Sequence, residues 1–295
     1  MKILRSHLTC VLARLASGLL AAAALALPAA AQDAAALKAR HGALAAQLAD
    51  NPFKRPLVLE SVEATGELKG DVYAVVNQPF ASVAQSLKTA DQWCDVLILH
   101  LNVKHCKASK ASPPVLSVSL GRKFDQPLED AYKADFIYKV AAADSDYLNV
   151  QMSAASGPMG TRNYRIGMEA VPLDDTRSFI HMSYAYGYGT AARLAMSAYL
   201  GTIGSDKVGF SVTGKTPEGK PVYMGGVRGV VERNTMRYFL AIESYLGAPG
   251  PAQVDKRLTD WFDATDRHAQ QLHEMDRSQY LDMKRKETRR QSESG

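Results

Sequence analysis

Between residues 113 and 188 the chain repeats one pattern five times, and this pattern limits the fold more than any other feature of the sequence. Apolar and polar residues alternate in the segments 115–120, 134–143, 147–154, 162–171 and 177–188. Short runs rich in Gly, Asp, Ser and Pro separate these segments. A period of two is typical of strands, and connections this short leave no room for crossover helices. The region therefore predicts an antiparallel meander.

The last of these segments has two chemically different faces. One face carries bulky apolar and aromatic residues, namely Ile180, Met182, Tyr184, Tyr186 and Tyr188. Three tyrosines with polar tips suit a half-wet pocket better than a dry interior. We therefore expect Met182, Tyr184 and Tyr186 to line a cavity. The alternative is that these side chains are packed in an ordinary hydrophobic core. His181 alternates with them and is expected on the opposite face.

Upstream of the meander, apolar spacing mostly predicts helices. Residues 33–50 predict an amphipathic leader helix. Residues 56–76 predict extended chain, either one long bent strand or a tight hairpin. Two short helices are then expected in tandem, over residues 80–87 and from Asp91 to Leu101.

Downstream of the meander, the pattern becomes mixed. Residues 190–200 predict a helix, and residues 208–212 and 222–231 predict the two strands of a hairpin. A helix capped by Asn234 and stopped at Gly247 should follow. The linker GAPGPA then leads to a last helical segment, at about 254–286.

The N-terminus predicts export. A basic start, an apolar run at 15–27 and a small-residue stretch at 28–31 form a cleavable signal peptide over residues 1–31, so that the mature chain begins near Gln32 in the periplasm. The alternative is an uncleaved membrane anchor, for which the apolar run is short against a span of about 20 residues.

Removing the signal peptide changes the charge balance. Loss of Lys2, Arg5 and Arg14 leaves 32 basic residues against 30 acidic ones. A nearly neutral chain gives no argument for nucleic acid as a partner. The remaining basic residues gather late, at 284–286 and 289–290. This basic tail is either a solvated helix end or a peripheral contact with anionic lipid head groups.

The stretch 91–107 holds Trp93 and both cysteines of the mature chain. Export places Cys94 and Cys106 in an oxidising compartment, where a disulfide closing this short loop adds about 3 kcal/mol in the chain-entropy model. Two buried free thiols are the alternative. We interpret the stretch as a cross-linked helical lid, with Trp93 a candidate to line the cavity.

Several patterns resemble catalytic signatures and lack the context these need. In GKTPEGKP, Pro221 follows Lys220 where a phosphate-binding loop has Ser or Thr. The G-x-G-x-x-A match at 187–192 lies in an antiparallel region, whereas the dinucleotide fingerprint belongs to a parallel sheet. His100 and His105 lack metal-ligand spacing with the cysteines. We therefore expect no cofactor, no metal and no catalytic residue from these motifs.

Arg228 is the remaining binding candidate. It lies among glycines in the expected strand 222–231, where close backbone approach leaves room around a guanidinium. In an apolar cavity an arginine suits a carboxylate or a phosphate. The alternative is a surface or ion-paired strand arginine.

The order of the expected elements resembles one known family. The opening strand with two short helices (VYAVVNQPFASVAQSLKTADQWCDVL), the meander and the late helix (NTMRYFLAIESYLG) are similar to the START-like, or SRPBCC, superfamily, in an exported bacterial branch. The resemblance covers residues 56–247, between a leader segment at 32–55 and a C-terminal helical extension at 248–295. It implies an α+β helix-grip fold, in which a curved antiparallel sheet grips a helix, and an apolar cavity for lipids, sterols or polyketide-like molecules.

Three functions are consistent with these features. The first is a binding or carrier protein for a lipid-like or other hydrophobic ligand, without chemistry of its own. The second is a cyclase- or hydrolase-type enzyme that uses His181 or a tyrosine hydroxyl as acid or base, which requires His181 to point into the cavity. The third is an envelope interaction module whose cavity is filled by its own side chains.

Overall fold

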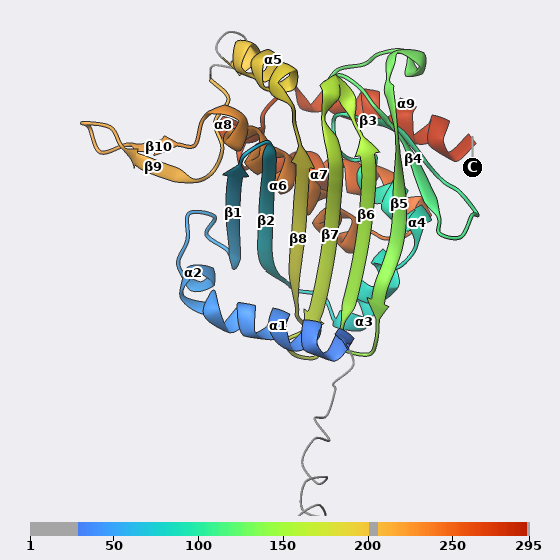
Figure 1. The fold of residues 1–295 in the computed structure, drawn as a ribbon. Coiled ribbons are helices and arrows are strands. Elements are labelled where there is room, and N and C mark those ends of the chain that lie inside the picture. Colours follow the sequence, from blue (N-terminus) through green and yellow to red (C-terminus); the bar gives the residue numbers. More distant parts are fainter. Residues whose placement is uncertain (1–28, 201–205, 294–295) are drawn as a thin grey trace, which may run out of the picture.

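Eight antiparallel strands form one sheet, in the order β1–β2–β8–β7–β6–β5–β4–β3 (Figure 1). The computed structural model describes residues 29–200 and 206–293. The meander consists of β4 (Val115–Leu120), β5 (Tyr132–Ala143), β6 (Leu148–Ser156), β7 (Arg162–Pro172) and β8 (Ser178–Gly187). All five strands expected from the alternation are confirmed.

The chain enters the sheet at one edge and crosses to the other. β1 (Leu57–Ala64) and β2 (Glu67–Val76) form a hairpin, which decides between the two expectations for this region, and β2 also pairs with β8. The helices α3 (Phe80–Leu87) and α4 (Ala90–Leu97) then carry the chain to β3 (Val103–Ala108) at the far edge. A capping box between Thr89 and Gln92 starts α4.

The expected helical lid is half strand. α4 ends at Leu97 and the chain turns into β3, whereas the apolar spacing predicted a helix through Leu101. The predicted disulfide is present, with Cα atoms of Cys94 and Cys106 5.1 Å apart, and it joins α4 to β3. Both cysteines are buried, so the cross-link lies within the core.

The long helix α6 (Gly226–Gly247) is gripped by the sheet. Our expected strand at 222–231 is wrong beyond the short β10 (Pro221–Tyr223), because the helix begins at Gly226 and not at Asn234. β10 pairs with β9 (Val212–Lys215) in a separate two-stranded hairpin. Gly70 of β2 lets α6 approach closely, since a Cβ atom there would lie 2.2 Å from the Thr235 hydroxyl.

Each face of the sheet carries its own core. The helices α3, α4, α6 and α7 (Val254–Asp266) pack on one face, around residues such as Trp93 and Phe239. On the other face lies the leader segment, which the structure divides into α1 (Ala29–Ala43) and α2 (Ala45–Ala49) (Figure 1). Leu37 and Leu44 of this segment pack against Tyr73 and Phe179.

The C-terminal extension is docked on the domain. Beyond α7, the short α8 (Ala269–Leu272) leads to α9 (Arg277–Glu293), which covers the edge strand β3. Lys284 is fully buried and donates hydrogen bonds to the carbonyl oxygens of His100 and Val103 at 2.8 and 2.7 Å and to Glu287 at 2.7 Å. Burial lowers the pKa of Lys284 to about 8.

The basic tail is therefore not a frayed end. Lys284 is buried, and the two residues after it form ion pairs: Arg285 with Asp255 at 2.8 Å and Lys286 with Asp125 at 3.0 Å. Among the described residues, no helix has the length and apolar character required to cross a membrane. Of the predicted signal peptide, residues 1–28 lie outside the described part of the chain, and residues 29–31 are at the start of α1.

Candidate ligand-binding site

A pocket of about 120 Å³ opens at one end of the grip, between the sheet, α6 and the inserted helix α5 (Thr190–Leu200). Its lining residues come from four different parts of the chain. The sheet supplies Leu68, Tyr164, Tyr184 and Tyr186, and Tyr188 follows directly after β8; the turn between β6 and β7 supplies Pro158, Met159 and Thr161; α5 supplies Ala192, Arg193 and Met196; and α6 supplies Val227, Val230 and Asn234.

Strand alternation places three of these tyrosines in the pocket. Residues two apart on β8 face the same side, so Tyr184 and Tyr186 project together toward α6, and Tyr188, directly after the end of β8, continues the row along the pocket. Tyr164 from β7 stacks on Tyr186 with ring centroids 5.3 Å apart, and the rings of Tyr184 and Tyr186 are 5.5 Å apart. The Tyr164 hydroxyl is 2.7 Å from that of Thr161.

The tyrosines act as neutral hydrogen-bond donors. Burial raises the pKa of Tyr184 well above its usual value and also raises the pKa of Tyr164 and of Tyr186. The phenol groups therefore stay protonated at physiological pH. No imidazole or carboxylate lines the pocket among the residues that the structure describes. The described lining can hold an apolar group and donate to its polar end, and the hydroxyl of one lining tyrosine, Tyr188, donates to the Glu63 carboxylate at 3.0 Å.

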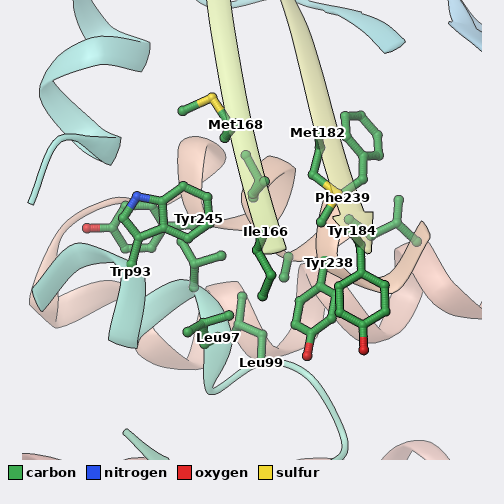
Figure 2. Close-up of a cluster of buried hydrophobic side chains, with 14 of the residues drawn as sticks. Trp93, Leu97, Leu99, Ile166, Met168, Met182, Tyr184, Tyr238, Phe239 and Tyr245 are labelled. Atoms are coloured by element: carbon green, nitrogen blue, oxygen red, sulfur yellow. The ribbon is translucent and has the colours of Figure 1, made fainter. Parts of the chain in front are cut away.

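Side chains fill the rest of the space between sheet and helices. Figure 2 shows Trp93, Ile166, Met182 and Phe239 directed into this interior, and all four side chains are almost fully buried. Two of the predicted cavity residues belong to this filled part. Trp93 donates its indole N–H to the Leu87 carbonyl oxygen at 2.7 Å, and Met182 has no exposed surface. Neither Trp93 nor Met182 lines the pocket, whereas Tyr184 and Tyr186 do.

Arg228 lies away from the pocket. It is on α6 rather than on a strand, and its guanidinium donates to the hydroxyl and the carbonyl oxygen of Ser61 in β1, both at 2.8 Å. Glu232, one turn later, also accepts a hydrogen bond from the Ser61 hydroxyl at 2.6 Å. Arg228 therefore ties α6 to the sheet edge, and it does not project into the cavity as an anion anchor.

His181 lies on the face of the sheet opposite to the pocket, as the alternation predicts. Its Nδ1 is 2.8 Å from Glu169 and its Nε2 is 2.8 Å from Asp71, while Tyr73 stacks on the ring at 4.3 Å. Burial alone would lower the pKa of His181, but the hydrogen bonds to the two carboxylates outweigh it and raise the pKa. With both nitrogens engaged beneath α1, His181 cannot serve as a base in the pocket.

The other sequence candidates are resolved more simply. The described residues contain no group of three His, Cys, Asp or Glu side chains placed to hold a metal ion. The GKTPEGKP segment forms the end of the β9–β10 hairpin, as expected, with residues 216–220 as the turn between the two strands. An open groove of about 620 Å³ lies outside the grip, between α4, β3, α7 and α9, with the disulfide among its lining residues.

Sequence reasoning missed part of the pocket. Tyr164 alternates with Ile166 and Met168 on β7, so its direction was readable from the same period of two that identified β8. Asn234 was interpreted as a helix cap, and only the true start of α6 places it in the third turn beside the pocket. For Met159, at the tip of a turn, the sequence carried no comparable pattern.

Comparison with known proteins gives matches in structure alone. No protein-family model and no curated protein matches the chain. Among solved structures, the chain is similar to a conserved protein from Geobacillus kaustophilus, at 12% identity and a TM-score of 0.35 over 61% of this chain and 95% of that chain. It is also similar to a point mutant of norcoclaurine synthase from Thalictrum flavum, at 13% identity and a TM-score of 0.32 over 50% of this chain and 89% of that chain. A third similar structure is human StAR-related lipid transfer protein 5, at 12% identity and a TM-score of 0.32 over 59% of this chain and 89% of that chain.

The fold is START-like. The element order carries this statement: a helix pair between β2 and β3, an antiparallel sheet, and the late helix α6 held across one face. The similarities to solved structures are too distant to argue for a ligand or a reaction.

Proposed function

We propose that the protein is a periplasmic binding or carrier protein for a hydrophobic ligand and has no chemistry of its own. The observation that supports binding is the tyrosine-lined pocket beneath α5, which combines apolar walls with several phenol donors. Binding sites for small molecules commonly have this composition, mostly apolar with a few polar groups that fix orientation. The absence of imidazole and carboxylate from the described lining favours binding over catalysis.

The pocket size limits what enters without rearrangement. An engineered apolar cavity of about 150 Å³ holds a benzene molecule. The 120 Å³ pocket therefore suits an aromatic ring or a short acyl segment of the ligand. A larger lipid-like molecule requires α5 to move away from α6.

A direct test starts with the protein beginning at residue 32, secreted and purified without detergent. Native mass spectrometry should find a non-covalent adduct of a hydrophobic molecule. The emptied protein should then extract lipid or another apolar compound from phosphatidylcholine vesicles. A protein that is empty on purification and extracts nothing contradicts the proposal.

A second candidate is an envelope interaction module. The filled interior around Trp93, Met182 and Phe239 favours it, because a carrier for a large ligand needs more space than the structure shows. Failure of every ligand test, together with specific capture of an envelope protein by the C-terminal helices, would select this function. Contact of the basic tail with an anionic membrane remains a separate proposal, now restricted mainly to Arg289 and Arg290.

A further inference from the structure

The mouth of the pocket carries exposed apolar side chains. Met159 is 63% exposed and forms part of the pocket wall, and Leu194 on α5 is 67% exposed. The turn Pro158–Gly160 contacts α5, so the two side chains belong to one end of the molecule. Met159 is at the turn tip with φ of 58°, a left-handed conformation that is uncommon for residues other than glycine.

Single exposed apolar side chains are ordinary on protein surfaces. Here, however, two large ones flank the opening of a pocket proposed to take a hydrophobic ligand. Each leaves more than half of its surface in water, so neither belongs to the buried core. Transfer of such surface out of water is favourable, by roughly 25 cal/mol per Å².

Two arginines accompany these side chains. Arg162 is the first residue of β7, and its guanidinium lies beside Gly189, where a Cβ atom on Gly189 would be 3.3 Å from Arg162 Nη1. Arg193 directly precedes Leu194 on α5. Both are exposed, and no ion pair joins either of them to another described residue. The nearby Arg165, by contrast, pairs with Glu67. This end of the molecule therefore combines apolar surface with cationic groups that have no carboxylate partner in the described chain.

We propose that Met159, Arg162, Arg193 and Leu194, together the mouth face, bind the surface of a bilayer with anionic head groups. Apolar side chains enter the head-group region and arginines pair with lipid phosphates, as in proteins that lie on membrane interfaces. The ligand then passes between bilayer and pocket without crossing water. This last step rests on the proposed binding function, whereas membrane contact itself does not.

The mouth face differs from the basic tail as a membrane contact. On α9, Lys284 is buried and Arg285 and Lys286 are held in ion pairs. The two surfaces can be separated by substitution, because Leu194 and Arg162 lie far in sequence from α9.

Sedimentation with vesicles tests the inference. The protein beginning at residue 32 is mixed with vesicles of phosphatidylcholine alone or of equal parts phosphatidylcholine and phosphatidylglycerol. Leu194→Asp and Arg162→Gln are compared with Ile137→Asp, which changes a residue 52% exposed on β5. Neither Leu194 nor Arg162 lines the pocket, so binding of a soluble fluorescent fatty acid is measured in parallel.

The wild type should bind the mixed vesicles in preference to phosphatidylcholine. Leu194→Asp should lower the bound fraction about tenfold and Arg162→Gln about fivefold, and Ile137→Asp should leave it unchanged. The inference would be overturned if the wild type bound neither kind of vesicle, or if Ile137→Asp reduced vesicle binding as much as Leu194→Asp does. It would also be overturned if only Arg289→Gln and Arg290→Gln reduced vesicle binding. If the fatty acid still binds in those cases, the proposed binding function stands.

Discussion

The rings of Tyr164 and Tyr186 stack with their centroids 5.3 Å apart, on neighbouring strands, at the wall of the pocket beneath α5. The ring centroid of Tyr184 is 5.5 Å from that of Tyr186 and 5.2 Å from that of Tyr238 on α6, which lies beside Tyr184 in Figure 2. The aromatic group thus extends from the open end of the grip toward the filled interior. It gives the pocket rigid apolar walls, and its hydroxyls, together with the side chains of Thr161 and Asn234, are polar groups that can orient a ligand.

The disulfide should form completely when the protein is produced in an oxidising compartment. Thiol titration of the unfolded, unreduced chain that begins at residue 32 should detect no free thiol. Replacing Cys94 and Cys106 by serine should lower the free energy of unfolding by about 3 kcal/mol, because the cross-link closes a short loop in the unfolded chain. Urea unfolding measures this change, and two titratable thiols in the chain produced under oxidising conditions would refute the pairing.

The double serine variant should still bind a hydrophobic probe while it remains folded. The disulfide joins α4 to β3, and neither cysteine lines the pocket. Weaker probe binding at a temperature well below unfolding would instead show that the cross-link shapes the pocket.

His181 should make stability depend on pH. Its pKa is raised, so its contribution is present below the ordinary imidazole pKa and is lost as pH rises through the raised value. The pKa values of Asp71 and Glu169 are lowered, despite burial, by their hydrogen bonds to His181, so their contribution is lost in acid. The stability difference between wild type and His181→Gln should therefore be largest between about pH 4.5 and 6.5.

Urea unfolding of both proteins across this pH range provides the measurement. The variant should lose about 2–4 kcal/mol at the maximum, because Asp71 and Glu169 lose the imidazolium that lies between them, and only Asp71 keeps a second cation, Lys69 at 2.9 Å. A difference that does not vary between pH 5 and 9 would contradict the assigned network. Fatty-acid binding should be unchanged, since His181 lies on the opposite face from the pocket.

The C-terminal extension should be an integral part of the domain. Lys284→Ala removes the buried cation of α9 that donates to the carbonyl oxygens of His100 and Val103, and it leaves Glu287 of the same helix paired only with Lys104 of β3, at 3.0 Å. Complete loss of one partner from a buried ion pair costs about 3–5 kcal/mol, and the cost here should be smaller because Lys104 still pairs with Glu287. Limited proteolysis should then cleave α9 first. Lys286→Ala, which breaks only an exposed pair with Asp125, should match the wild type; equal effects of the two substitutions would argue against the buried contact.

The sequence predicted the sheet well because one rule applies along it. From β4 to β8 the side chains alternate between two faces and short turns join neighbours, so bounds and pairing could be read locally. The same rule put Tyr184 and Tyr186 in the pocket and His181 outside it. Where local pattern and tertiary position disagree, the prediction failed. Residues 226–231 contain valines and glycines that suit a strand, yet packing against β1 and β2 holds them in the first turns of α6.

The cavity was less predictable than its walls. Whether Trp93 and Met182 border an open space depends on how completely residues from several elements fill it, and alternation on one strand carries no information on volume. Arg228 was placed in the cavity only because its strand was wrong. Tyr164 and Asn234 belong to other elements, and their approach to β8 is a property of the assembled fold.

The central claim is that a hydrophobic ligand occupies the pocket beneath α5. Titration with a soluble fluorescent fatty acid, followed by fluorescence, tests it most directly. Ala192 is 8% exposed and lines the pocket, whereas Ser197 is on the exposed side of the same helix. Wild type and Ser197→Phe should bind one probe per chain with equal affinity, and Ala192→Phe should bind at least about tenfold more weakly, because the added ring occupies the ligand's space. Equal affinity of Ala192→Phe and wild type, with the variant folded, would contradict the claim.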